Sequence, residues 1–271
     1  MHDILNQILS DTRAVVARSK REMPVSLLED RPLFGADRRS LAEALRCNNL
    51  AFVAECKRTS PSRGRIRNDY DIPALARSYH KAGAEAISVL TEPIHFEGSP
   101  DDMSAARREV DTPLLRKDFI FDPYQLFEAR AIGADAILLI AAALDPSQLY
   151  DLHQAADELR LSCLVEVHDL REIETLDFDQ IRVLGVNNRD LRTFEVNIDH
   201  APKVFSHVPA GIVRVAESGL KTSREMAYLR SRGVDAVLIG ETLMRADDPG
   251  DMLAILKKEV AERITSKDLS V

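Results

Sequence analysis

Charged side chains follow several short apolar runs of this chain, at the points where the runs end. Lys117 closes the run Pro113–Lys117, and Asp122-Pro123 then opens an amphipathic segment. A lysine at the carboxyl end of a buried strand, just before the turn into a helix, occupies a position where α/β enzymes place catalytic groups. Taken alone, Lys117 fits a solvated charge at a strand end equally well. The rest of the chain has to decide between the two interpretations.

Polar residues also close most of the other apolar runs. In chain order these are Glu55, Lys57 and Ser60, then Thr91 and Glu92, Glu166, Asn187 and Arg189, Glu217 and Ser218, and Gly240 and Glu241. Glu55 and Lys57 are two residues apart, so they point to the same face of one strand. If they are buried there, they should pair with each other or with a ligand. A lysine acid and a glutamate base suit isomerisation, aldol-type cleavage or ring closure with loss of water, and composition does not choose among these.

The apolar runs alternate with amphipathic segments from residue 50 onward, as in a parallel sheet covered on both faces. The runs are Ala51–Cys56, Ala86–Thr91, Pro113–Lys117, Asp135–Ala141, Ser162–Val167, Ile181–Asn187, Ile212–Glu217 and Ala236–Gly240. The segments with helical spacing include 72–82, 123–132, 146–160, 221–231 and 250–266. Eight such units predict an α/β fold of the (β/α)8 TIM-barrel type. The alternative is an open doubly wound sheet, but no Gly-x-Gly-x-x-Gly follows the first run.

A partial internal repeat supports the barrel. Gly83, Gly133 and Gly233 each follow a helical segment and precede an acidic residue and an apolar run. A glycine in this place typically ends a helix in the left-handed conformation. Their spacings of about 50 and 100 residues are multiples of one strand–helix unit.

The first 48 residues precede the barrel. Residues 3–18 have the spacing of an amphipathic helix, 19–36 read as a loop, and Asp37 could cap a short helix that ends at Arg46. This segment is too short for a domain of its own. We therefore expect one domain over residues 1–271, in which an N-terminal helical extension, 1–48, covers part of a barrel formed by 49–271.

Composition excludes several classes of function. The formal net charge of -8 argues against nucleic acid as the main partner. The apolar run 136–144 is too short to cross a bilayer, and no signal peptide is evident. Three cysteines without a close pair fit a reducing cytoplasm and indicate neither a disulfide framework nor a zinc site. We expect a cytoplasmic protein without a metal site, and a helix-capping role for Asp169 in His168-Asp169.

The loops after the seventh and eighth runs contain Ser218-Gly219 and Gly240-Glu241. In barrels these two loops are a recurrent phosphate site, because glycines let backbone N–H groups approach an anion closely. The sequence therefore predicts a phosphorylated substrate. The carboxylate of Glu241 would have to point away from the phosphate.

Six motifs, in order, resemble the strand-end motifs of the indole-3-glycerol phosphate synthase family. They are Glu55-Cys56-Lys57-Arg58-Thr59-Ser60-Pro61-Ser62, Ser88-Val89-Leu90-Thr91-Glu92, Leu115-Arg116-Lys117-Asp118-Phe119-Ile120 with Asp122-Pro123-Tyr124-Gln125, Glu166-Val167-His168, Gly185-Val186-Asn187-Asn188-Arg189-Asp190-Leu191, and Val215-Ala216-Glu217-Ser218-Gly219. The resemblance runs from about residue 3 to residue 265. It departs at Thr59, where some members have a lysine, and in the loop 95–99, which is more acidic here than is usual.

The resemblance implies conversion of 1-(2-carboxyphenylamino)-1-deoxyribulose 5-phosphate into indole-3-glycerol phosphate, CO2 and water, without cofactor or metal. It implies that Lys117 is the general acid at the ribulose carbonyl oxygen and that Glu166 is the general base for dehydration. Lys57 would meet the anthranilate carboxylate, and Glu55, Asn187 and Glu217 would surround the reacting amine and hydroxyls. Substrate or phosphate would be held by Ser60, Phe119, Arg189, Ser218, Gly219, Gly240 and Glu241.

The alternative enzyme is a Schiff-base sugar-phosphate aldolase or lyase on the same barrel, with Lys117 as the nucleophile. The alternative outside enzymes is a barrel kept as a metabolite-binding scaffold, which would not need Glu55, Lys57, Lys117 and Glu166 together. We expect a monomer, with a weak homodimer as the alternative.

Overall fold

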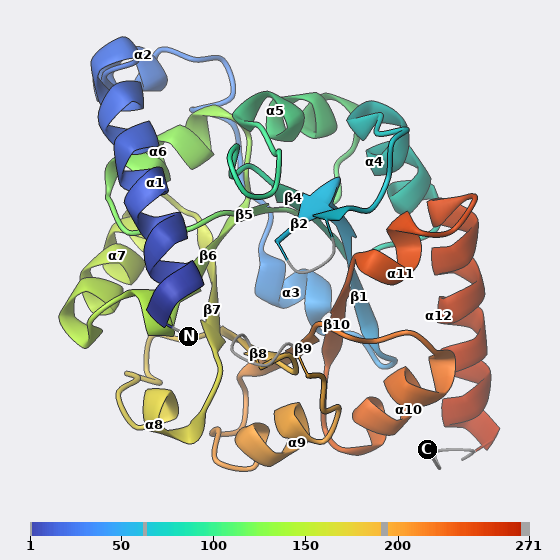
Figure 1. Cartoon of the computed structure of the whole chain (residues 1–271). Coiled ribbons are helices and arrows are strands. Elements are labelled where there is room, and N and C mark those ends of the chain that lie inside the picture. The colour runs from blue at the N-terminus through green and yellow to red at the C-terminus, as the bar shows by residue number, and fades with distance from the viewer. Residues whose placement is uncertain (1, 62–63, 191–194, 267–271) are drawn as a thin grey trace.

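The computed structural model describes residues 2–61, 64–190 and 195–266. Its centre is a closed barrel of eight parallel strands, in the order β1-β10-β9-β8-β7-β6-β5-β4 (Figure 1). The strands are β1 Ala51–Cys56, β4 Ala86–Leu90, β5 Leu114–Lys117, β6 Ala136–Ile140, β7 Ser162–Val167, β8 Val183–Asn187, β9 Val213–Glu217 and β10 Ala236–Ile239. The predicted barrel is confirmed, and closure of the sheet excludes the open doubly wound alternative.

A helix follows every barrel strand and covers its outer face. These helices are α4 Ile72–Lys81, α5 Pro100–Glu109, α6 Tyr124–Ala131, α7 Pro146–Glu158, α8 Leu170–Ile173, α9 His200–Phe205, α10 Ser223–Ser231 and α12 Pro249–Ser266. The residues that cap these helices lie at the helix starts. Asp145 accepts a hydrogen bond from the backbone N–H of Gln148 in α7, and Thr222 forms a capping box with Glu225 in α10. Asp169 caps α8 as expected. Gly83, Gly133 and Gly233 have positive φ, as the repeat predicts.

The smaller elements lie in loops at the strand ends. They are the hairpin β2 Thr59–Ser60 and β3 Gly64–Arg65, the 3-10 turn Ala141–Ala143, and the helix α11 Glu241–Met244. The hairpin follows β1, and α11 follows β10, so both extend strands that end in predicted site residues.

The N-terminal segment differs in part from its prediction. Helix α1 runs over His2–Glu22 and a second helix, α2, over Val25–Glu29, whereas the sequence predicts a loop from residue 19. Periodicity missed α2 because the contacts that hold it are distant in sequence, where Leu28 packs beside Tyr124 of α6. The third helix, α3, begins only at Leu41 and ends at Leu45, and Ser40 caps it instead of Asp37. Before α3, Arg38 donates to the carbonyl groups of Leu33 and Arg130.

The barrel interior follows the two-residue period of its strands. Inward positions are apolar in the lower and middle layers, for example Val53 of β1, Leu115 of β5 and Leu164 of β7. Helix α3 belongs to the same cluster and lies within the ring of strands in Figure 1. The next inward position toward the carboxyl end of each of these strands is Glu55, Lys117 or Glu166, so alternation alone turns these charges into the upper barrel.

Candidate active site

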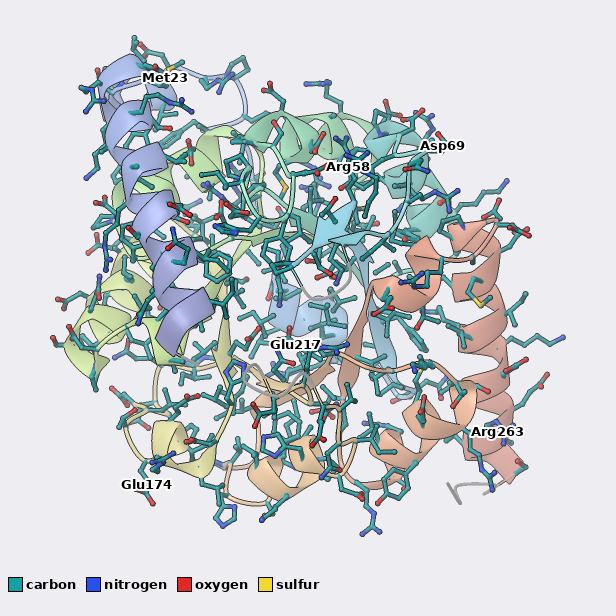
Figure 2. All side chains as sticks on the ribbon, viewed as in Figure 1. Met23, Arg58, Asp69, Glu174, Glu217 and Arg263 are labelled. Atoms are coloured by element: carbon teal, nitrogen blue, oxygen red, sulfur yellow. The ribbon has the colours of Figure 1, made fainter. Side chains whose placement is uncertain are left out.

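A cavity of about 820 Å³ lies at the carboxyl ends of the strands, and all predicted site residues line it. Figure 2 shows Glu217 near the centre of the ring, whereas Met23, Glu174 and Arg263 lie at the periphery. The set from β1, β5, β7, β8 and β9 comprises Glu55, Lys57, Lys117, Glu166, Asn187 and Glu217. The set from the loops comprises Ser60, Phe119, Arg189, Ser218, Gly219, Gly240 and Glu241.

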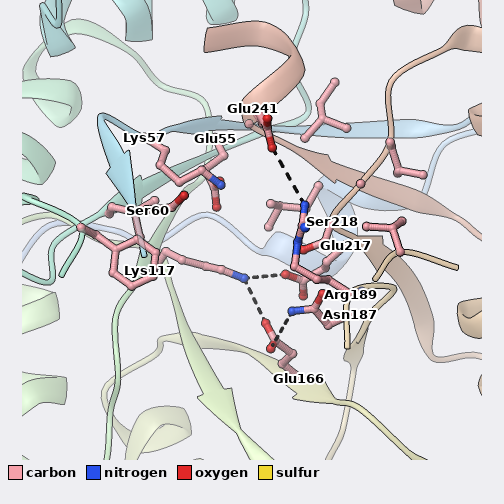
Figure 3. Close-up of a pocket in the computed structure, with 18 of the residues that line it drawn as sticks. Glu55, Lys57, Ser60, Lys117, Glu166, Asn187, Arg189, Glu217, Ser218 and Glu241 are labelled. Atoms are coloured by element: carbon pink, nitrogen blue, oxygen red, sulfur yellow. Dashed lines mark hydrogen bonds and ion pairs between the residues drawn. The ribbon is translucent and has the colours of Figure 1, made fainter. Parts of the chain in front are cut away.

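Lys117 is the centre of an ion-pair cluster. Its Nζ lies 2.5 Å from Oε2 of Glu217 and 3.1 Å from Oε2 of Glu166 (Figure 3). Asn187 donates from Nδ2 to Oε1 of Glu166 over 3.4 Å. The side chain of Lys117 is only 14% exposed, which excludes the solvated strand-end charge considered above. Two strands, β7 and β9, therefore each place a carboxylate against one ammonium group, and Asn187 of β8 lies between them and holds Glu166.

Burial and charge oppose each other in this cluster. Burial favours a lower pKa for Lys117, but the carboxylates of Glu217, Glu166 and Glu55 outweigh it and raise the pKa above the ordinary lysine value. Burial likewise works to raise the pKa of Glu166, and the charges of Lys117 and His168 reverse this, so that the pKa is lowered. Burial and the neighbouring carboxylates raise the pKa of Glu217 to about 8. Lys117 and Glu166 therefore favour their charged forms, whereas Glu217 takes up a proton more readily than an ordinary glutamate.

Lys57 and Glu55 form a second ion pair, at the carboxyl end of β1. Nζ of Lys57 lies 2.5 Å from Oε1 of Glu55, which confirms the pairing expected from their two-residue spacing. Glu55 is buried and Lys57 is partly exposed. Lys57 is therefore the member of this pair that an incoming anion can reach.

Two glycines make room for the buried carboxylates. A Cβ at Gly185 of β8 would fall on Oε1 of Glu217, and a Cβ at Gly240 would fall on Oε1 of Glu55. Only glycine leaves this space, so the positions of both carboxylates depend on backbone contacts from the neighbouring strands.

The loops after β9 and β10 meet beside Arg189. Ser218 has φ 68° and Gly219 has φ 77°, so the chain turns sharply out of β9 into the cavity. Thr242 Oγ1 donates to the carbonyl of Leu220 over 2.6 Å and so joins the two loops. Glu241 Oε2 lies 3.9 Å from Nη2 of Arg189, and its Oε1 accepts from Nε of Arg245 over 3.0 Å. Both arginines line the cavity, so cationic groups flank the glycine-containing loops.

Some residues named at strand ends do not join the cavity. Glu92 is fully buried and accepts from the backbone N–H groups of Ile94, His95 and Phe96, so it fixes the loop after β4. Thr91 donates to Asp118. Ser62 and Leu191, which belong to two of the motifs, lie outside the described residues.

Several lining residues were not foreseen. Ile4, Leu5 and Ile8 of α1 line one side of the cavity, and Phe96 faces Phe119 with ring centroids 6.1 Å apart. The helical spacing of the first residues predicts an apolar stripe but gives no sign of where that stripe packs. Phe96 lies several residues after the end of β4, so the pattern of strand-end residues does not predict it.

Within the described ranges, no three His, Cys, Asp or Glu side chains are grouped so that they could hold a metal ion. No helix among the described residues is long and apolar enough to span a membrane.

Comparison with known proteins agrees with this arrangement. The family model described as indole-3-glycerol phosphate synthase matches residues 5–256. The chain belongs to the indole-3-glycerol phosphate synthase family. A relative of that name from Salinibacter ruber is 55% identical over 260 residues, which cover 94% of this chain and 96% of the relative. Another, from Rhodopirellula baltica, is 43% identical over 249 residues, with 90% and 95% covered.

Solved structures with low identity share the fold alone. The 3-hexulose-6-phosphate synthase from Salmonella typhimurium has a TM-score of 0.63 at 15% identity and covers 79% of this chain and 99% of its own. The orotidine 5'-phosphate decarboxylase from Pyrococcus horikoshii has a TM-score of 0.59 at 14% identity, with 78% and 99% covered. The fold and the family predicted from the motifs are thus confirmed. The roles of the individual site residues stay predictions.

Proposed function

We propose that this chain is an indole-3-glycerol phosphate synthase. It closes the indole ring of 1-(2-carboxyphenylamino)-1-deoxyribulose 5-phosphate and releases CO2 and water. Family membership supports the overall reaction. The observation that carries the mechanism is the buried ammonium of Lys117 between Glu166 and Glu217, beside a cavity large enough for the substrate.

Ring closure puts negative charge on the ribulose carbonyl oxygen as the aromatic carbon attacks it. An ammonium aimed at that oxygen stabilises the charge and can transfer a proton to it. Lys117 fits this role because its raised pKa keeps it protonated at neutral pH. Phe119 and the apolar side chains of α1 offer surfaces for the aromatic ring of the substrate.

Decarboxylation restores the aromatic ring once the carboxylate is held out of the ring plane. Lys57 can bind that carboxylate because its partner Glu55 is buried and fixed beside Gly240. When the anthranilate carboxylate approaches, it shares the ammonium with Glu55. Loss of CO2 removes this second anion from Lys57 and so aids release.

Dehydration needs an acid for the leaving hydroxyl and a base for the proton that the five-membered ring gives up. Glu166 is the base, since its lowered pKa keeps it ionised and Asn187 holds one of its oxygens. Glu217, whose pKa is raised to about 8, takes up a proton close to neutral pH and can then donate a hydrogen bond to a substrate hydroxyl. One lysine and one glutamate thus divide the acid and base work.

The phosphate lies, in this proposal, between Arg189 and the backbone N–H groups of the loops after β9 and β10. Ser218, Gly219, Gly240 and Glu241 belong to these loops, and Ser60 faces them from the loop after β1. Glu241 contacts both Arg245 and Arg189, so its carboxylate does not point away as predicted, and the two guanidinium groups offset its charge beside the phosphate.

A Schiff-base aldolase is less well supported. Such an enzyme needs a neutral lysine, and the carboxylates around Lys117 favour its charged form. Borohydride added during turnover should leave Lys117 unmodified.

We further propose that residues 1–271 form one domain that acts as a monomer in the cytoplasm, without cofactor, nucleic-acid or membrane partner. The three cysteines are free thiols, two of them buried, which fits a reducing compartment. The cluster that joins Leu28 of α2 to Tyr124 of α6 supports a single domain.

Substrate labelled in its carboxyl group tests the proposed function. The purified chain should release labelled CO2 and indole-3-glycerol phosphate in equal amounts. Sugar-phosphate fragments without CO2 would contradict the proposal and favour the aldolase.

A further inference from the structure

The proposed reaction takes up one proton from solvent in each turnover. The anthranilate carboxylate enters as an anion and leaves as neutral CO2. The carbonyl oxygen receives two protons before it departs as water, whereas the five-membered ring gives up only one. The acid and base groups of the site must therefore gain one further proton before the next turnover.

His168 lies beside the proposed base and has no assigned part in the mechanism. Its side chain is 5% exposed, and Nε2 is 3.7 Å from Oε1 of Glu166. Both ring nitrogens are buried and have no hydrogen-bond partner among the described residues. Because buried imidazole nitrogens without partners are unfavourable, the arrangement calls for an explanation.

The backbone of His168 is held while its ring is not. The N–H donates to Oε2 of Glu172 over 2.6 Å, and the carbonyl accepts from Nε2 of His200 over 2.5 Å. These backbone bonds place the ring next to Glu166, and neither of its buried nitrogens is engaged in a hydrogen bond within the described residues. A separation of 3.7 Å is slightly longer than a hydrogen bond, and such contacts often shorten when the substrate complex forms.

We propose that His168 relays the solvent proton to the Glu166–Lys117 pair, an inference that rests on the proposed function. The protonated imidazole gives its Nε2 proton to Oε1 of Glu166. Rotation of the carboxyl group then presents this proton to the neutral amine of Lys117, 3.1 Å away, and restores the ammonium. The imidazole becomes neutral and is recharged by water, so atoms and charge balance.

The charges around the ring and the ion pair favour the second step of the relay, from Glu166 to Lys117. Glu166 of β7, Glu172 of α8 and Asp169 before it are the acidic groups near the imidazole, and Lys117 of β5 and His200 of α9 are the basic ones. Burial raises the pKa of Glu172. The pKa of Glu166 is lowered and that of Lys117 is raised, so a proton on Glu166 passes downhill to the neutral lysine.

Single-turnover and steady-state rates separate a relay from a structural role. With enzyme in excess, the first turnover uses the protons already on the site, so His168→Gln should form indole at nearly the parent rate. In the steady state the same variant should be slower by at least about tenfold, and most of all above neutral pH, because each cycle waits for a proton.

Chemical rescue by imidazole and a control variant at another buried histidine complete the experiment. Added imidazole should restore steady-state turnover to His168→Ala, and His153→Gln, another buried histidine that lies on α7 away from the cavity, should leave both rates unchanged. Equal losses in both rates, or no loss in either, would overturn the relay. If the parent chain forms no indole, the proposed function itself fails, and the two failures are thereby distinguished.

Discussion

The ammonium of Lys117 touches two carboxylates, and these contacts decide what the residue can do. Glu217 at 2.5 Å and Glu166 at 3.1 Å keep it charged, so it can give a proton but is a poor nucleophile. The charge of Lys117 thus follows from contacts among side chains at the ends of three alternate strands, β5, β7 and β9.

Replacement of Lys117 by alanine should lower kcat by at least about 100-fold, within the range of a general acid. The reason is the loss of the group that protonates the carbonyl oxygen. Steady-state indole formation measures the effect, and Lys81→Ala, an exposed lysine on α4, is the control. A near-normal kcat would remove Lys117 from the role of acid.

Glu166→Gln should stop the reaction after ring closure and decarboxylation. The amide keeps the shape and the contact with Asn187 but cannot take a proton. In single turnovers, labelled CO2 should appear at close to the parent rate while indole fluorescence lags or is absent. Simultaneous appearance of both products would rule out this division of steps.

Glu217 should make the stability of the fold depend on pH. Its pKa is raised from 4.5 to about 8, so the folded state holds a proton that the unfolded chain has lost between these values. This contribution to stability is complete below pH 4.5 and is lost as the pH rises through about 8. We therefore expect Glu217→Gln to gain stability relative to the parent as the pH rises from about 5 to about 9. Urea unfolding at several pH values measures the difference, and a constant difference would contradict the assigned shift.

The sequence predicts a site residue wherever the two-residue period of a strand determines the direction of its side chain. Glu55 and Lys57 had to share a face, and Lys117 had to end a buried strand. The protonation of Glu217 was not predictable, because it depends on Glu166 and Lys117, residues far away in sequence.

At the scale of elements, a buried side chain at a strand end needs space that a neighbouring strand leaves for it. Gly185 of β8 is the clearest case, since any side chain there would fall on the carboxylate of Glu217. Strand alternation predicts that Glu217 points inward, but only the register between β8 and β9 shows which residue must be small.

Gly185→Ala should displace the Glu217 carboxylate and lower kcat by at least about tenfold, as when a proton-transfer group is misplaced. Gly35→Ala is the matched control, because an added Cβ there meets nothing within 4 Å. Steady-state rates measured beside thermal unfolding separate a loss of geometry from a loss of fold. Full activity in a folded Gly185→Ala protein would show that the carboxylate is free to move.

Some helix bounds are set by neighbouring residues in the sequence, and others by contacts with distant parts of the chain. Caps such as Asp145 and Thr222 are encoded beside the helices that they start. Helix α2 packs on α6, and Arg38, just before α3, donates to a carbonyl of α6, so their local sequences alone gave the wrong bounds.

At the scale of the whole molecule, α1 supplies part of the lining of the cavity at the carboxyl ends of the barrel strands. Ile4, Leu5 and Ile8 lie on the lining although the strands supply the chemistry. The ion pair of Lys20 with Asp122, 2.6 Å apart, ties the far end of α1 to the loop that follows Lys117. The cavity is therefore lined and held together by parts of the chain that are separated by more than a hundred residues.

Ile8→Asp should raise KM by at least about fivefold with a smaller effect on kcat, because a charge replaces an apolar wall of the cavity. Ile255→Asp on α12 is the control, since that side chain is 51% exposed. An unchanged KM for Ile8→Asp would show that α1 does not contact the substrate.

The most direct test of the account is the indole fluorescence of the protein mixed with the carboxyphenylamino-deoxyribulose phosphate. The chain has no Trp, so a new indole signal stands out against a low protein background. We predict a rising signal in the presence of a chelator and without added cofactor, and loss of the signal in the Lys117→Ala and Glu166→Gln proteins. A flat trace from the folded parent protein would contradict the proposed reaction.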